Sequence, residues 1–214
     1  KGAVWLTGKR GGRKHLRKAT AQLSPGDILD LFYDARLLSL KPPVAQCLHD
    51  ARQYSVWFKP AGLLAQGTDY GDHCSLVRQV EVHFRLKRPV LPVHRLDREA
   101  AGLMILAHTK AAAAKLSGLL QVNGIDKQYR VTVLGRLGSD SGVIDLPLDR
   151  KPAITRYILT AYDPGSNTSI VEVTLETGRL HQIRRHFALI GHPVLGDPKY
   201  GQGNKNSTGM ELVA

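Results

Sequence analysis

Strand-like segments recur through most of the chain, and they constrain the fold more than any other feature of the sequence. In "TSIVEVTLE", residues 168–176, Val171, Val173 and Leu175 alternate with other residues and would share one face of a sheet. Other segments rich in β-branched and aromatic residues lie at 54–58, 127–135 and 153–163. Several strands therefore have to pair into a sheet.

A few helical segments separate these strands. "TKAAAAKLSGLLQ", residues 109–121, is dominated by alanine, and Thr109 can cap its start. The apolar spacing of "SLVRQVEVHFRL", residues 75–86, favours a helix, although its β-branched residues oppose one. A third helix is predicted at 180–191, with an apolar stripe of Leu180, Ile183, Phe187 and Ile190. The pattern predicts an α+β fold, with a mainly antiparallel central sheet and flanking helices.

The composition changes along the chain and suggests three parts. Residues 1–45 read as a small basic unit that ends in a linker, "LKPPVAQ". Residues 46–201 hold most of the predicted strands and helices and form the main domain. Residues 202–214 are mostly polar and glycine-rich, so we predict a flexible tail. The chain begins with Lys1 rather than Met, which suggests a segment upstream of it.

The net charge of +12 indicates a polyanionic partner. Residues 1–20 carry seven Lys or Arg and no acid, which favours a surface for nucleic acid over a solvated tail. The glycines of this segment do not fit the phosphate-loop pattern. No apolar run reaches the roughly 18 residues of a membrane span, and no signal peptide is visible. Two cysteines indicate a reducing compartment, so we expect the cytoplasm.

One acid stands out inside a basic stretch. In "HRLDREAAGLMILA", residues 94–107, Asp97 lies between Arg95 and Arg98, just ahead of an apolar run that reads as a buried strand. Such an acid is either part of a surface ion pair or a catalytic carboxylate that neighbouring cations keep ionised.

Four segments, in order, resemble motifs of the RluA-type pseudouridine synthases. Along the chain they are "VWFKPAGLLAQ" at 56–66, "HRLDREAAGLMILA" at 94–107, "KQYRV" at 127–131 and "TLETGRLHQIRRHFALIGHPVLGDPKYG" at 174–201. The N-terminal unit more loosely resembles the second half of a small RNA-binding domain that is often fused to these enzymes. On this resemblance we expect the unit to be truncated at Lys1.

The resemblance implies that the chain isomerises uridine to pseudouridine in ribosomal or transfer RNA, with no cofactor. Asp97 matches the catalytic aspartate of the family, and Arg184 matches the arginine that pairs with it. Tyr129 matches the tyrosine that packs against the extruded base and takes part in proton transfer. Three roles for Asp97 stay open: attack on the sugar, attack on the base, and proton abstraction.

The remaining expected site residues would bind RNA or shape the pocket. They are Lys59, His94, Arg95, Arg98, Lys127, Arg179, His181, Gln182 and Ile183. Ile183 would form an apolar wall, and Lys59 and Lys127 would touch phosphate or support the pocket. His181 would bind the RNA backbone or cap the helix. Ala100 and Ala101 stand where the family more often has threonine and serine, which puts the loop contacts in doubt.

Other classes of function fit the sequence less well. Cys47, His49, His73 and Cys74 do not have zinc-site spacing, and no matched cluster of carboxylates suggests a metal-dependent nuclease. The leading rival is a basic RNA-binding module that keeps the fold without catalysis. Asp97, Tyr129 and Arg184 argue against it, because binding alone does not need them. We expect a monomer that binds RNA, no metal and no membrane.

Overall fold

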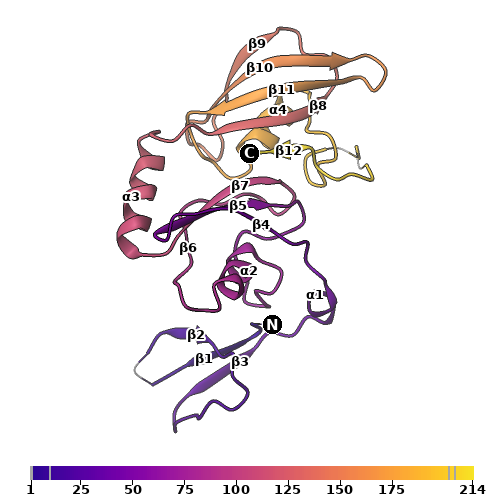
Figure 1. Cartoon of the computed structure of the whole chain (residues 1–214). Coiled ribbons are helices and arrows are strands. Elements are labelled where there is room, and N and C mark those ends of the chain that lie inside the picture. The colour runs from indigo at the N-terminus through magenta and orange to yellow at the C-terminus, as the bar shows by residue number, and fades with distance from the viewer. Residues whose placement is uncertain (1, 10, 202, 205) are drawn as a thin grey trace. The chain divides into compact units, whose positions relative to one another are not determined.

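The computed structural model describes residues 2–9, 11–201, 203–204 and 206–214. The chain divides into two compact units (Figure 1). Unit 1 comprises Lys1–Arg95 and Met104–Ala113, and unit 2 comprises Leu96–Leu103 and Ala114–Ala214. The first compact unit extends well beyond residue 45. The predicted division into an RNA-binding unit at 1–45 and a catalytic domain at 46–201 stays a prediction.

Unit 1 begins with a small antiparallel sheet in the order β2-β1-β3. Its strands are β1 (Val4–Thr7), β2 (Arg13–His15) and β3 (Ile28–Leu31). The basic N-terminal segment therefore contains a strand, β2. The short helix α1 (Ala35–Ser39) follows, capped by Asp34, whose Oδ1 accepts from the Leu37 amide at 3.0 Å.

The first sheet is held to the rest of unit 1 by the loop at residues 67–72. The indole of Trp5 donates to the carbonyl oxygen of Asp69 at 2.9 Å, and Arg17 pairs with the buried carboxylate of Asp72. The N-terminal basic segment is therefore anchored in this unit.

The second sheet has the order β4-β5-β7-β6. Its strands are β4 (Gln46–Asp50), β5 (Tyr54–Lys59), β6 (Leu91–Pro92) and β7 (Gly102–Ala107). Helix α2 (Leu76–His83) starts at Ser75, whose hydroxyl accepts from the Arg78 amide at 3.2 Å. Helix α3 (Lys110–Gln121) starts after Thr109, whose Oγ1 accepts from the Ala112 amide at 3.0 Å. Both helices were predicted, and the cap at Thr109 is confirmed.

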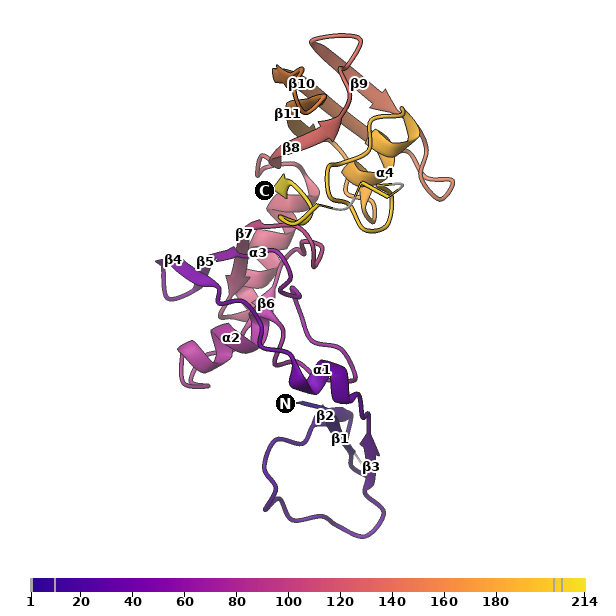
Figure 2. The same ribbon diagram turned by 90° about the vertical axis from the view of Figure 1, so that its right-hand side faces the viewer.

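Unit 2 is built on an antiparallel sheet in the order β12-β8-β11-β10-β9. Its strands are β8 (Gln128–Leu134), β9 (Ser141–Asp145), β10 (Ile154–Asp163), β11 (Thr168–Leu175) and β12 (Leu212–Val213). Helix α4 (Gln182–Leu189) covers one face of this sheet (Figure 2). Ile183 and Phe187 of α4 pack in one core with Val171 and Val173 of β11, as their spacing predicted. Leu180 lies before the helix and is exposed, so the predicted stripe is one residue shorter.

The prediction of a flexible tail at 202–214 is wrong for its last residues. Met210 and Leu212 are buried in the core of unit 2, and β12 pairs with β8. The Leu212 carbonyl accepts from the Ala101 amide at 3.1 Å, and the Ala214 carbonyl accepts from the Leu103 amide at 3.0 Å. The end of the chain therefore lies between β8 and the segment that follows Asp97. The prediction failed because most residues of this segment are polar or glycine, and Met210 and Leu212 are its few buried apolar side chains.

No helix in the described part of the chain has both the length and the apolar character to cross a membrane.

Candidate active site

Asp97 lies in the loop that leads into β7, and a buried arginine holds its side chain. The Nη1 of Arg184, on α4, donates to Oδ2 of Asp97 at 2.8 Å. The side chain of Asp97 is 25% exposed and that of Arg184 is 2% exposed. The expected pairing of these two residues is confirmed. The second oxygen, Oδ1, accepts no hydrogen bond from any described residue, so one oxygen of the carboxylate is held while the other stays free.

Arg184 is fixed by a second carboxylate behind it. Its Nε donates to Oδ2 of Asp197 at 2.7 Å, and its Nη2 donates to Oδ1 of the same residue at 2.8 Å. Burial alone would lower the pKa of Arg184, but the hydrogen bonds to Asp197 and Asp97 outweigh it and raise the pKa. The guanidinium therefore stays charged, and its fork cannot turn away from Asp97.

Asp197 was not among the expected site residues. Its side chain is fully buried and also accepts from the backbone amides of Lys199, at 2.8 Å, and Tyr200, at 3.0 Å. Burial raises the pKa of this carboxyl, yet the Arg184 guanidinium and the two amides hold it below its usual value. The sequence carried one signal, since Asp197 falls inside the C-terminal matching segment, but its burial is a property of the fold.

His181 also faces Asp97. Its Nε2 lies 3.7 Å from Oδ1 of Asp97, and its Nδ1 lies 3.0 Å from the phenol oxygen of Tyr200. His181 is the N-cap residue of α4, but its side chain makes no capping hydrogen bond. Burial lowers the pKa of the imidazole despite the nearby charge of Asp97, which keeps the ring neutral at pH 7.

Tyr129, on β8, is half-buried against the core of unit 2. Burial raises the pKa of its phenol, and the charge of Asp97 raises it further. Tyr129 therefore keeps its proton at neutral pH, close enough to Asp97 for the two groups to interact. The structure thus brings Asp97, Arg184, Tyr129 and His181 together in unit 2.

Three of the residues expected to bind RNA or to shape the pocket are engaged inside the protein. Lys59 is fully buried, and its Nζ donates to the carbonyl oxygens of Pro60, at 3.1 Å, and Leu63, at 2.8 Å. This supports the loop and leaves no access to phosphate. Ile183 is a buried member of the core of unit 2, and its place in an apolar wall of the site stays a prediction. His94 accepts at Nε2 from the Ile105 amide at 3.1 Å, and burial lowers its pKa, so it is a neutral support for β7.

Gln182, which was expected to bind RNA, is also engaged inside the protein. It is buried, and its Oε1 accepts from the hydroxyl of Thr177 at 2.8 Å and from the Arg179 amide at 2.9 Å. Its Nε2 donates to the Ile154 carbonyl and to Thr155 Oγ1, each at 3.0 Å. With its amide group engaged on both sides, Gln182 fixes the turn into α4 rather than binding RNA.

The other expected RNA contacts stay accessible. Arg95 and Arg98 are exposed, and Arg98 lies 3.3 Å from Glu99 in a surface pair. Lys127 donates to Oδ1 of Asn123 at 2.8 Å, and Arg179 donates to the Pro152 carbonyl at 2.9 Å. For these residues, contact with RNA stays a prediction.

Ala100 and Ala101, in the loop that follows Asp97, have no hydroxyl groups to support the loop, and other contacts position them. Ala100 is buried in the core of unit 2, and the amide of Ala101 donates to the Leu212 carbonyl. Gly102 follows with φ of +136°, and a Cβ there would lie 2.4 Å from the carbonyl oxygen of Ala214. Packing and the C-terminal strand therefore position the loop.

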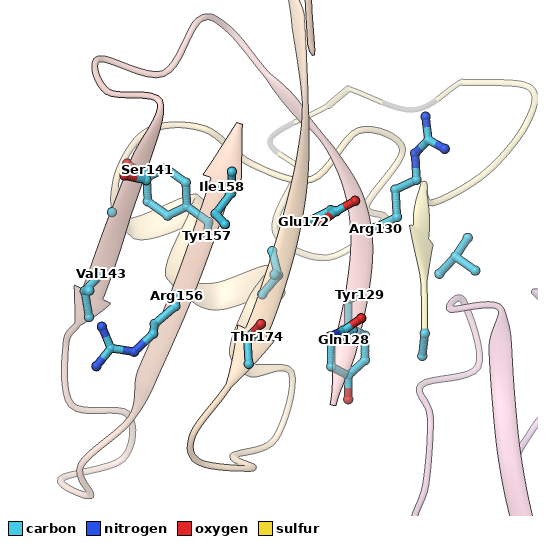
Figure 3. Close-up of a pocket in the computed structure, with 14 residues that line it drawn as sticks. Gln128, Tyr129, Arg130, Ser141, Val143, Arg156, Tyr157, Ile158, Glu172 and Thr174 are labelled. Atoms are coloured by element: carbon cyan, nitrogen blue, oxygen red, sulfur yellow. The ribbon is translucent and has the colours of Figure 1, made fainter. Parts of the chain in front are cut away.

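A cavity of about 680 Å³ lies on the exposed face of the unit 2 sheet (Figure 3). Its lining residues include Tyr129, Arg130, Arg156, Ile158 and Glu172. Neither Asp97 nor Arg184 lines this cavity, so the Asp97–Arg184 pair is not part of it.

A free carboxylate oxygen beside a neutral tyrosine and a fixed arginine suits an enzyme that uses covalent or acid–base chemistry. Residues 53–189 match the family described as RNA pseudouridylate synthase. That match covers more than half of the 214 residues, and the chain belongs to this family.

Several curated relatives agree. An uncharacterized RNA pseudouridine synthase of Aquifex aeolicus (strain VF5) is 33% identical over 226 residues, which cover 94% of this chain and 69% of the relative. The dual-specificity RNA pseudouridine synthase RluA of Pasteurella multocida (strain Pm70) is 34% identical, with 77% of this chain and 82% of the relative covered. The ribosomal large subunit pseudouridine synthase D of Nitrosomonas europaea is 34% identical, but the match spans only 49% of its length.

Solved structures show the same fold. The human RNA pseudouridylate synthase domain containing 1 has a TM-score of 0.69 at 22% identity, with 82% of this chain and 79% of that chain covered. The human domain containing 4 protein has a TM-score of 0.64 at 24% identity, with 78% and 81% covered. The predicted α+β fold with antiparallel sheets is confirmed.

Proposed function

We propose that this chain isomerises specific uridines in ribosomal or transfer RNA to pseudouridine, using Asp97 as its catalytic carboxylate. The observation that carries the proposal is the asymmetric binding of that carboxylate: Arg184 holds Oδ2, and Oδ1 stays free. A buried guanidinium holds and orients the group, as a nucleophile or a base requires.

The other residues of the site fit the same reaction. The target base has to leave the RNA stack before its bond to ribose can be reached. Tyr129 offers a flat ring close to Asp97 on which the extruded base can pack. The exposed side chains of Arg95 and Arg98 flank Asp97 in the sequence and can bind phosphates on either side of that base.

The class of RNA is proposed from charge and from the relatives. A net charge of +12 suits a polyanionic substrate. One relative is named as a dual-specificity synthase and another as a synthase of the ribosomal large subunit. We propose that the chain acts in the cytoplasm as a monomer, with no cofactor or metal.

Pseudouridine mapping across cellular RNA tests this function. RNA is compared from cells with and without the gene, and from deletion cells that express either the wild type or Asp97→Asn. We expect at least one site that is lost on deletion and restored by the wild type alone. RNA that is bound by the protein but shows no lost site would support the non-catalytic binding module instead.

A further inference from the structure

His181 adopts a left-handed backbone conformation that residues other than glycine rarely take. Its φ is +52° and its ψ is +32°, in the left-handed region, directly before α4. Such a conformation is strained and persists only where the surroundings of the residue fix it. It makes no capping bond that would explain the strain. The contacts of its imidazole ring offer another reason.

Those contacts link Tyr200 to the catalytic carboxylate. The phenol oxygen of Tyr200 lies 3.0 Å from Nδ1 of His181, and Nε2 on the far side of the ring lies 3.7 Å from Oδ1 of Asp97. The Tyr200 ring also lies 5.2 Å from the Cζ of Arg184. Tyr200 thus contacts both residues that face Asp97.

The charges around the ring decide which nitrogen carries its proton. A neutral imidazole has one N–H, and the partner of each nitrogen sets its place. A lone pair on Nε2 of His181 would be repelled by the negative carboxylate of Asp97. A hydrogen on Nε2 is instead attracted to that carboxylate. Nδ1 is then the acceptor, and the Tyr200 hydroxyl is its donor. Arg184, Glu99 and Lys199 also act on the ring electrostatically: Glu99 raises the pKa of His181, and Arg184 and Lys199 lower it.

We propose that Tyr200 is a positioning residue for the isomerisation: its hydroxyl holds His181 in the tautomer that presents Nε2–H to the free oxygen of Asp97. The role in the reaction rests on the proposed function. Arg184 then orients one oxygen of the carboxylate, and the Tyr200–His181 pair keeps the other facing a donor. At 3.7 Å the contact leaves Oδ1 free to react.

The substitution Tyr200→Phe removes the hydroxyl and keeps the ring. Without that donor, the imidazole proton can move to Nδ1, and a lone pair then faces Asp97. We expect the single-turnover rate of pseudouridine formation to fall about tenfold or more, while the Kd for RNA stays within about twofold, since the loss concerns a group that orients the reacting carboxylate.

Tyr162→Phe is the matched control. Its phenol donates to Oδ1 of Asn167 at the same distance, 3.0 Å, on the exposed end of β10. We expect a wild-type rate for this variant. The double variant Tyr200→Phe, His181→Gln tests rescue, because a glutamine amide donates to Asp97 whatever stands at residue 200. We expect it to be faster than Tyr200→Phe alone.

The tautomer itself is measured by long-range ¹H–¹⁵N NMR of His181 in the whole protein. We expect the Nε2–H form in the wild type and a shift toward Nδ1–H in Tyr200→Phe. The inference would be overturned if His181 carried its proton on Nδ1 in the wild type. It would also be overturned if the wild type were active and Tyr200→Phe formed pseudouridine at the same rate. A wild type that makes no pseudouridine in any cellular RNA would instead overturn the proposed function, and with it the role of Tyr200 in that reaction.

Discussion

Arg184 and Asp197 form a two-bonded ion pair in which both side chains are buried, with N–O distances of 2.7 and 2.8 Å. The next residue along α4, Arg185, makes the same kind of pair with Asp149, at 2.8 and 2.9 Å, but there the carboxylate is 68% exposed. The two neighbouring pairs differ mainly in burial. They therefore separate the effect of burial from the effect of geometry.

Asp197→Asn should destabilise the fold by about 3–5 kcal/mol, because it leaves the buried Arg184 without its main counter-charge. Asp149→Asn, the control, should leave the urea midpoint nearly unchanged, since an exposed pair is screened by solvent. Urea unfolding of both variants measures this. Equal destabilisation of the two would show that burial does not decide the value of the Arg184 pair.

The buried His186 predicts a loss of stability on mild acidification. Its Nδ1 contacts Thr155 Oγ1 at 2.9 Å, and its Nε2 donates to the Leu146 carbonyl at 2.9 Å. Burial lowers its pKa below the usual 6.5, although the bond to Leu146 opposes this. The unfolded chain therefore binds the proton more readily, and stability falls as the pH drops through 6.5 toward the folded pKa.

His186→Gln removes this titration. Comparing free energies of unfolding at about pH 7.5 and 5.5 should show a smaller loss in the variant than in the wild type. The histidines at 94 and 181 have lowered pKa values as well and should leave part of the effect in place. An identical loss in both proteins would refute the assignment to His186.

The end of the chain should be needed for folding. Leu212→Ala removes a side chain from the core of unit 2 and should cost about 2–4 kcal/mol. Val213→Ala changes the neighbouring residue of β12, whose side chain points the other way and is 43% exposed, and should cost much less. Thermal unfolding compares them. Matching melting temperatures would mean that β12 does not contribute its core contact in solution.

The N-terminal lysines should contribute RNA affinity. Lys9, Lys14 and Lys18 are exposed, so Lys→Gln at all three keeps the sheet and removes three charges. If each contacts a phosphate, the slope of log K against log salt should flatten by about 2 for single-stranded RNA. Lys110→Gln with Lys115→Gln, on α3, is the control for general loss of charge. A slope that is the same as in the wild type would exclude contact by the N-terminal segment.

Local sequence signals predicted part of the fold. The alanine-rich α3 with its Thr109 cap and the alternating β11 carry their own signals. The strands β2 and β12 do not: "RKH" is cationic, and "LV" is too short to show a period. β2 becomes a strand by pairing with the nearby β1, and β12 becomes one by pairing with β8, which lies far away along the chain. Pairing of this kind is not readable from local composition.

The site shows the same division. The pairing of Asp97 with Arg184 followed from the family resemblance, whereas the support by Asp197 depends on burial that only the fold creates. Lys59 is the opposite case, because a lysine is expected at the surface and this one is buried on loop carbonyls. Residue type alone could not separate the side chains that face solvent from those that hold the site together.

Single-turnover formation of pseudouridine, measured with an RNA found by the mapping experiment, tests the central claim. Asp97→Asn keeps the size of the side chain and removes its charge. We predict no product above background, with RNA binding unchanged or tighter, because one negative charge near the phosphates is gone. A near wild-type rate in Asp97→Asn would contradict the account and would leave Asp97 as no more than an ion-pair partner of Arg184.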